Sequence, residues 1–311
     1  MVGAGPAGLT AALYATRFRR ATLVLHDGAA RAGQIPLTRN VPGHDGGIAG
    51  PELLARMTRH AEGYGATLRE ARVVEAAREG GAFRLTDAAG VTHTARAVIL
   101  ATGVRHNRPQ LPENVHQAAV DAGVLRYCPI CDGFEHRDER IAVLGCDVSG
   151  AAEALFLRTY SGDVTLLPRR DVALTDEEQG DLERAGVHVL DHAVTRFEPT
   201  AQDIRLHCEG RAEPLVFDVL YPALGARPRS DLARMLGLAL TEDGKAPDNA
   251  SFGTAIPGLY AAGDLVEGLD QISVAMGHGA IAATRAHNWL REQDGATVEA
   301  VLGEDPEAAK D

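Results

Sequence analysis

The sequence is poor in cysteine, tryptophan and positive charge, and each shortage excludes a class of protein. It contains four cysteines and one tryptophan in 311 residues. Four cysteines are too few for the disulfide framework of a small secreted protein, so we expect a reducing compartment. Lysine and arginine number 31 against 43 acidic residues, which gives a formal charge of −12. This excess of negative charge argues against nucleic acid and anionic membrane as partners.

Long apolar runs are missing as well. No segment approaches the roughly 20 apolar residues that a membrane-spanning helix requires, and no export signal precedes the first glycine-rich loop. We therefore expect a cytoplasmic protein. Only Met1 and Val2 precede that loop, where a strand of roughly five residues is expected. We expect in-frame residues upstream to complete this strand.

A complete G-x-G-x-x-G motif opens the chain. The loop is Gly3-Ala4-Gly5-Pro6-Ala7-Gly8. An Ala- and Leu-rich helix follows it, and then a run at 21–25 that is typical of a strand. Such glycines let the backbone approach a pyrophosphate, which then lies at the helix N-terminus. The motif in this context predicts dinucleotide binding.

The end of that strand offers two candidates for contact with the adenosine part of the nucleotide. His26 stands where a Rossmann domain often has an acid for the ribose hydroxyls, and Asp27 follows it directly. Either side chain can serve, Asp27 as an acceptor and His26 as a donor. The sequence leaves this choice open.

A second glycine-rich loop follows the apolar run 141–144 and contains Gly145, Ser149 and Gly150. It predicts a second nucleotide-binding domain. Asp147 occupies the place of the middle glycine, and it brings a side chain and a negative charge to the place where a pyrophosphate should approach.

Two arginines, Arg169 and Arg170, follow the next apolar run at 163–167. Basic residues at this strand end are where the 2′-phosphate of NADP binds, whereas an acid there favours NAD. We therefore expect NADPH rather than NADH. The alternative interpretation is a solvated charged turn.

Cys128 and Cys131 are separated by two residues and lie before the second glycine loop. Such a pair can close a disulfide and exchange two electrons with a partner dithiol. Asp132 follows directly and can move the proton that each step requires. Half of a zinc site or two buried thiols are the alternatives. A zinc site would need His136 and Cys146, but Cys146 belongs to the second glycine loop, so we expect no metal.

Short apolar strands alternate with helices along the whole chain, which predicts the α/β class. We expect two Rossmann-like nucleotide-binding domains, the second inserted in the first. Residues 1–110 and 240–311 form the first, and residues 111–239 form the second and carry the cysteine pair.

Further motifs complete a pattern that covers nearly the whole chain. They are Gly33-Gln34, Asn40-Val41-Pro42-Gly43, Ala101-Thr102-Gly103 and Gly258-Leu259-Tyr260-Ala261-Ala262-Gly263-Asp264. In this order, together with the loops and the cysteine pair, they make the chain resemble the low-molecular-weight thioredoxin reductases, a family of flavoproteins.

The resemblance implies FAD, held without a covalent bond, with Asp264 binding the ribityl chain. The residues implied in FAD binding are Gly3, Gly5, Pro6, Ala7, Gly8, His26, Asp27, Gln34, Asn40, Ala101, Thr102, Gly103, Gly263, Asp264, Gln271 and Ile272. NADPH is implied at Gly145, Ser149, Gly150, Arg169 and Arg170. The resemblance further implies a homodimer in which the two domains of each chain rotate relative to each other during turnover.

The resemblance also implies a relay. Electrons pass from NADPH through FAD to the Cys128–Cys131 disulfide, and from there to thioredoxin or a small disulfide. It assigns Cys131 to the flavin side, Cys128 to disulfide interchange and Asp132 to acid–base catalysis.

Several positions depart from the family pattern. Pro168 precedes the arginine pair and no third arginine follows, Val41 replaces an aromatic residue, and of the expected Tyr-Arg-Gln only Gln271 remains. These changes leave the electron donor and the partner open. A ferredoxin-dependent reductase and a dithiol oxidase of the same fold are alternatives, and a non-catalytic FAD-binding redox sensor is an alternative of another class.

Overall fold

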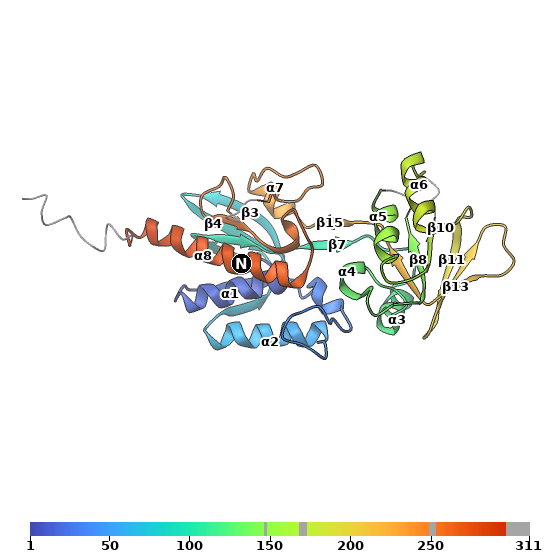
Figure 1. The fold of residues 1–311 in the computed structure, drawn as a ribbon. Helices are drawn as coiled ribbons and strands as arrows, with labels where there is room; N and C mark the ends of the chain where they lie inside the picture. Colours follow the sequence, from blue (N-terminus) through green and yellow to red (C-terminus); the bar gives the residue numbers. More distant parts are fainter. Residues whose placement is uncertain (146–147, 168–172, 249–252, 297–311) are drawn as a thin grey trace, which may run out of the picture. The chain divides into compact units, whose positions relative to one another are not determined.

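The computed structural model describes residues 1–145, 148–167, 173–248 and 253–296 (Figure 1). The chain forms two compact units. The first consists of Met1–Ile35, Ala49–Arg105 and the residues from Pro228 onward, and the second of Pro36–Ile48 and His106–Arg227. The sequence placed the two points where the chain crosses between the domains near 110/111 and 239/240. The return crossing lies earlier because α7 (Asp231–Met235) packs against β3 (Val73–Glu79) of the first unit.

The crossings themselves are extended. β7 (Val104–His106) and β15 (Ala226–Pro228) pair with each other as a two-stranded ribbon. Backbone hydrogen bonds from Asn107 to Gly225 and from Arg229 to Gly103, 3.0 and 2.9 Å long, extend the pairing at both ends. The unit boundaries at 105/106 and 227/228 both fall within this ribbon.

The first unit is built on a parallel sheet whose central position is occupied by Val2. Its strands are β1 (Leu23–His26), β2 (Thr67–Glu70), β6 (Val98–Leu100) and β16 (Leu259–Ala261). β1 pairs with β2, and β6 pairs with β16. Val2 forms parallel bridges to Leu25 on one side and to Leu100 on the other. The short segment thus joins the two strand pairs into one sheet.

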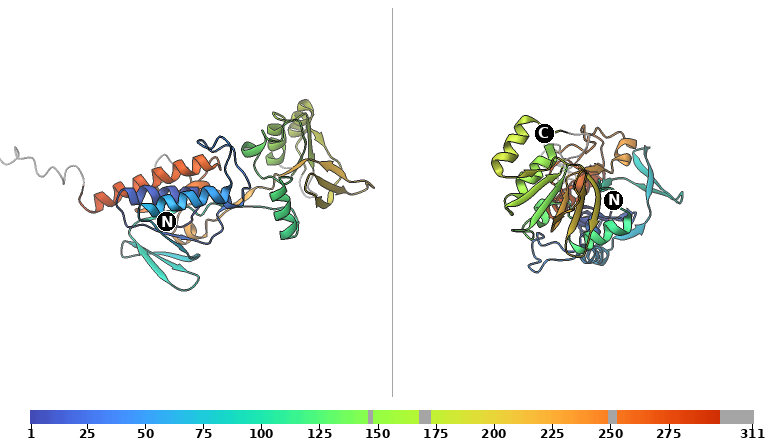
Figure 2. Two further views of the ribbon diagram at one scale, coloured as in Figure 1. Left: turned by 90° about the horizontal axis from the view of Figure 1, so that it is seen from below. Right: turned by 90° about the vertical axis from the view of Figure 1, so that its right-hand side faces the viewer.

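Three long helices cover the first unit, and α1 and α8 lie side by side in Figures 1 and 2. They are α1 (Pro6–Arg17), α2 (Gly50–Gly63) and α8 (Ile272–Gln293). The backbones of α1 and α8 approach closely because residue 279 is glycine: a Cβ there would lie 2.2 Å from the carbonyl oxygen of Ala7. The unit is completed by two 3-10 helices and an antiparallel sheet: η1 (Arg31–Gln34), η2 (Gly263–Leu265), β3, β4 (Ala82–Asp87) and β5 (Thr92–Ala95).

The second unit contains a four-stranded parallel sheet in the order β10-β9-β8-β14. These strands are β8 (Arg140–Leu144), β9 (Asp163–Leu167), β10 (His188–Val189) and β14 (Val219–Pro222). Every residue of β14 is buried, so this strand lies inside the core. Its helices and its antiparallel sheet are α3 (Glu113–Ala122), α4 (Pro129–Asp132), α5 (Val148–Leu157), α6 (Asp176–Ala185), β11 (Val194–Pro199), β12 (Ile204–Cys208) and β13 (Leu215–Phe217).

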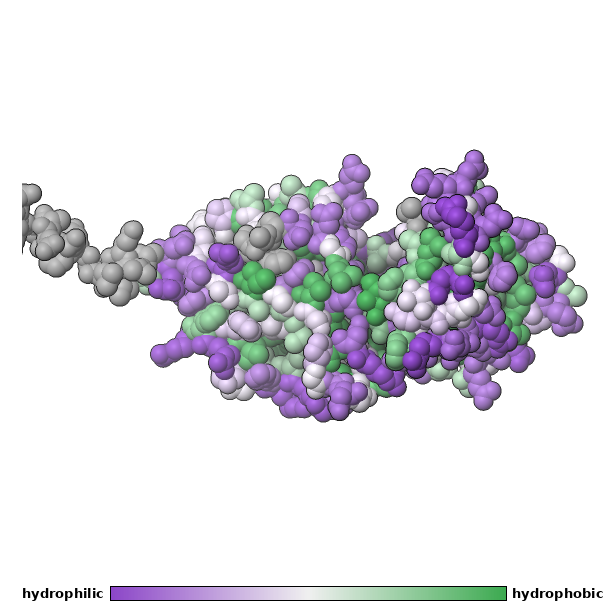
Figure 3. Space-filling view, in the orientation of Figure 1, coloured by the Kyte–Doolittle hydropathy of each residue, from purple (hydrophilic) through white to green (hydrophobic). Residues whose placement is uncertain are grey.

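Hydrophilic side chains cover most of the outer edge of each unit in Figure 3. Within the described residues, no helix is both long and apolar enough to cross a membrane. Two large apolar side chains are exposed close to the cysteine pair, Ile130 and Phe134.

Candidate active site

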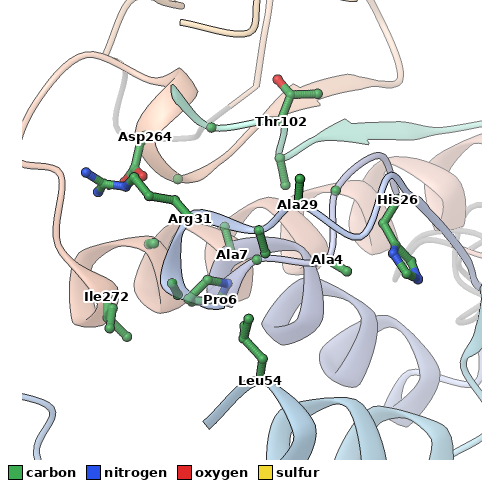
Figure 4. A pocket seen from close by; sticks show the side chains of 18 of the residues that line it. Ala4, Pro6, Ala7, His26, Ala29, Arg31, Leu54, Thr102, Asp264 and Ile272 are labelled. Carbon is green, nitrogen blue, oxygen red and sulfur yellow. The ribbon is translucent and has the colours of Figure 1, made fainter. Parts of the chain in front are cut away.

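A cavity of about 410 Å³ lies in the first unit (Figure 4). It is lined by the ends of the parallel strands and by the segments that follow them. Among its lining are thirteen of the residues that the sequence implicated in FAD binding: Gly3, Gly5, Pro6, Ala7, His26, Asp27, Ala101, Thr102, Gly103, Gly263, Asp264, Gln271 and Ile272.

The glycines of the first loop have different structural roles. A Cβ at Gly8 would lie 1.9 Å from the carbonyl oxygen of Gly3, and Gly3 itself has φ +109°. These two glycines therefore permit the close contact of loop and helix. Gly5 lines the cavity, and a Cβ there would meet no atom within 4 Å. It is the N-cap of α1 with ordinary extended backbone, φ −78°, and has no side chain to cap the helix.

Asp264 is the middle residue of η2 and forms an ion pair inside the cavity. Its Oδ2 lies 3.0 Å from Nη2 of Arg31, and Figure 4 shows the two side chains meeting on one side of the cavity. Burial raises the pKa of Asp264, and the positive charge of Arg31 opposes this effect. Arg31 also donates to the carbonyl oxygen of Asp270, at 3.4 Å. Arg31 could not be identified from the sequence, because nothing in a motif indicates which cation a distant acid will contact.

His26 and Asp27 both line the cavity, as the sequence proposed, but they differ in their partners. His26 Nδ1 accepts a hydrogen bond from the backbone of Gly28 at 3.2 Å. Asp27 Oδ2 pairs with Nη1 of Arg229 at 3.2 Å. Arg229 follows the crossing strand β15 and also lines the cavity. It was not identified from the sequence.

Three of the implied residues are not among those that line this cavity. Gly8 is packed beneath the loop, and Gln34 closes η1. Asn40 belongs to the second unit, where its Oδ1 accepts a hydrogen bond from Thr38 Oγ1 at 2.9 Å.

The cysteine pair lies at the start of α4 in the second unit. Cys128 is the N-cap, and its carbonyl oxygen accepts from the backbone N–H of Cys131 at 2.9 Å. The two cysteines form a disulfide with their Cα atoms 5.3 Å apart. The pair is therefore oxidised in this structure.

Asp132, the last residue of α4, is held from two sides. The hydroxyl of Tyr221 donates to Oδ1 at 2.8 Å, and Nε of Arg126 lies 3.6 Å from Oδ2. Burial raises the pKa of this carboxyl, while Tyr221 and Arg126 act in the opposite direction. Asp132 follows Cys131 directly in the chain, and a carboxyl with a raised pKa holds its proton more readily than an ordinary aspartate, as a proton donor requires.

The residues considered for a zinc site have other surroundings. His136 Nδ1 lies 2.6 Å from Oε2 of Glu139, and Cys146 lies outside the described residues. Within the described residues, no group of three or more His, Cys, Asp or Glu side chains is arranged to hold a metal.

The second glycine loop repeats the close contact of the first. A Cβ at Gly150 would lie 2.1 Å from the carbonyl oxygen of Gly145, which has φ +146°. Ser149 is exposed in α5. Asp147, Arg169 and Arg170 lie outside the described residues.

Comparison with known proteins agrees with this architecture. The family model of the pyridine nucleotide-disulphide oxidoreductases matches residues 1–279. A thioredoxin reductase of Mycolicibacterium smegmatis is 35% identical, over 94% of this chain and 96% of its own length. The solved structure of HlmI is 29% identical with a TM-score of 0.87, covering 95% of this chain and 92% of its own. That of a thioredoxin reductase from Streptococcus pyogenes MGAS5005 is 26% identical with a TM-score of 0.85, covering 94% and 97%.

These likenesses confirm the α/β class and the two Rossmann-like domains that the sequence predicted. They extend over both glycine loops and the cysteine pair. The chain therefore belongs to the pyridine nucleotide-disulphide oxidoreductase family, and its relatives include proteins named thioredoxin reductase.

Proposed function

We propose that the protein is a thioredoxin reductase-like flavoenzyme, which passes electrons from NADPH through FAD to the Cys128–Cys131 disulfide and on to thioredoxin or a similar disulfide. The observation that supports it most strongly is this disulfide with a buried acid beside it, in a chain that belongs to this family. The likeness to thioredoxin reductases supports a cytoplasmic homodimer as well, and light scattering of the purified protein tests its mass.

The cavity of the first unit fits the FAD of this proposal. Gly5 lines this cavity and leaves open space where a side chain would stand, so a pyrophosphate can reach the first N–H groups of α1. Asp264 offers a carboxylate to ribityl hydroxyls, and Asp27 offers one to the ribose. When bound, FAD supplies the transfer of a hydride from NADPH and of two electrons to a disulfide.

The remaining steps belong to the side chains of the second unit. The dithiol formed from Cys128 and Cys131 attacks an external disulfide through Cys128, and Cys131 closes the ring again. Asp132 takes and returns the proton of a thiol during this exchange. Arg169 and Arg170 support NADPH over NADH by their charge, and Asp147 weakens the preference.

The first experiment is anaerobic titration of the purified yellow protein with NADPH, with NADH and with reduced ferredoxin. We expect NADPH to bleach the flavin at the lowest concentration. A thioredoxin-coupled insulin reduction assay then tests the acceptor, with the double variant of Cys128→Ser and Cys131→Ser as control.

The outcomes separate the alternatives. Bleaching by ferredoxin alone would identify a ferredoxin-dependent reductase. Consumption of oxygen with small dithiols, without any nicotinamide, would identify a dithiol oxidase. Bound flavin with no turnover of any acceptor would leave a redox sensor. Disulfide reduction that persists in the double variant would refute the role of the pair.

A further inference from the structure

Tyr221 is a fully buried phenol with an acidic partner. Its side chain is 0% exposed and packs in the apolar core of the second unit. A buried hydroxyl requires a hydrogen-bond partner, and that of Tyr221 donates to Oδ1 of Asp132 at 2.8 Å. Burial and the adjacent Asp132 raise the pKa of this phenol. Tyr221 therefore remains protonated and acts as the donor in this pair.

The other oxygen of the same carboxyl faces a guanidinium. Nε of Arg126 lies 3.6 Å from Oδ2 of Asp132, too far for a hydrogen bond but close enough for charge attraction. The backbone N–H of Arg126 donates to the carbonyl oxygen of Leu220 at 3.0 Å, the residue that precedes Tyr221 in β14. The buried strand β14 thus carries Tyr221 and also binds the backbone of Arg126.

Two further ionisable groups act on Asp132, and each has a partner of its own. His136 follows in the turn after α4, and its Nδ1 lies 2.6 Å from Glu139. Glu135 lies between Asp132 and His136 in the sequence, and its Oε1 is 3.9 Å from Nη1 of Arg39. Both act on the carboxyl through charge alone, and more weakly than Tyr221 and Arg126.

We propose that Tyr221 and Arg126 are positioning residues, which fix the orientation of the Asp132 carboxyl and favour its charged form so that it can exchange a proton with the dithiol. The inference rests on the proposed function, in which the dithiol turns over. Burial favours the protonated form of the carboxyl, and the hydroxyl and the guanidinium favour its charged form. Removing either group should therefore make the carboxyl hold its proton more tightly.

Reduction of the Cys128–Cys131 disulfide requires a fixed number of protons. Opening the disulfide breaks one S–S bond and forms two S–H bonds. This takes two electrons, which the flavin supplies in the proposed relay, and two protons, one through Asp132 and one from solvent. When the dithiol reduces an external disulfide, electrons and protons leave the two cysteines, and Asp132 takes a proton back.

The test is the titration of Asp132 in the resting, oxidised protein. Aspartate labelled with ¹³C at the carboxyl carbon gives an NMR signal for each residue, and Asp132→Asn identifies the signal of interest. Tyr221→Phe removes only the hydroxyl, so we expect the midpoint of Asp132 to rise by about one pH unit. Arg126→Met should raise it in the same direction. Tyr260→Phe, which removes another buried hydroxyl in the first unit, should leave it unchanged.

Turnover supplies an independent measurement. The limb of the pH profile of disulfide reduction that disappears in Asp132→Asn should move to higher pH in Tyr221→Phe. A role in packing alone would lower the melting temperature without moving that limb. An unchanged Asp132 midpoint in a folded Tyr221→Phe protein would overturn the inference, and if this variant does not fold, Arg126→Met decides it. If the wild-type protein reduces no disulfide, the proposed function fails, yet the titration still decides the positioning role.

Discussion

Replacement of Gly5 by valine tests the cofactor assignment without disturbing the fold. The backbone at Gly5 is extended, with φ −78°, and a Cβ would meet no atom within 4 Å. Valine adopts this backbone conformation and has fewer unfolded states to lose, but it is a poorer N-cap than glycine. The two effects oppose each other, so the stability of the apoprotein should change by no more than about 1 kcal/mol. The new side chain would occupy the place of the pyrophosphate.

The expected loss of FAD affinity can be estimated from the hydrogen bonds at the N-terminus of α1. If the phosphates lose two charge-assisted hydrogen bonds to the first N–H groups of α1, each worth about 1.5–3 kcal/mol, the loss is about 3–6 kcal/mol. This corresponds to roughly a 10²- to 10⁴-fold weaker affinity for FAD.

The assay is fluorescence titration of the flavin-free protein with FAD, beside urea unfolding of the same samples. Gly277→Val is the matched control: residue 277 is exposed on α8, outside the cavity, and a Cβ there also meets no atom within 4 Å. It should bind FAD normally. Gly8→Val should instead lose the fold, because of the contact with Gly3. Normal flavin occupancy in Gly5→Val would refute the reasoning.

Three further predictions concern packing, redox chemistry and pH. Gly279→Ala should destabilise the protein by about 1–3 kcal/mol in urea unfolding, since two helix backbones must separate, whereas Gly277→Ala on the open side should stabilise it by about 0.5–1 kcal/mol. On reduction, Cys131→Ser should lack a long-wavelength thiolate–flavin absorbance that Cys128→Ser keeps; the opposite pattern would exchange their assigned roles. Burial lowers the pKa of His116, so the folded state binds fewer protons than the unfolded state. The free energy of unfolding should therefore fall as pH decreases below about 6.5, and less so in His116→Gln; parallel curves would contradict this.

The part of the site that a local motif encodes could be predicted from the sequence. Gly5 and Asp264 each stand in a short pattern whose backbone geometry follows from adjacent residues, and both line the cavity. Arg229 could not be predicted, because it meets Asp27 across 202 residues of sequence. Tyr221 could not be predicted either. It lies in an apolar strand, where a tyrosine is indistinguishable from an ordinary core residue until its hydroxyl is seen to reach an acid.

The domain limits illustrate the same physical difference. Turn-forming residues near Pro109 and Gly244 indicate where the chain can bend. The limits of the units depend instead on which residues pack together. The helix α7 joins the first unit through its contact with β3, and no local composition records that contact.

The close backbone contact that recurs in the two glycine loops affects what a G-x-G-x-x-G motif indicates. In each loop the outer glycines, Gly3 with Gly8 and Gly145 with Gly150, are required by the approach of one backbone to another, so selection for folding alone would retain them. In the first loop the middle residue is Gly5, where a Cβ would meet no atom within 4 Å, and the sequence of the second loop has aspartate at this position of the motif. A match to the motif can therefore reflect the packing of loop against helix alone, and only a binding measurement shows whether a loop of this kind holds a nucleotide.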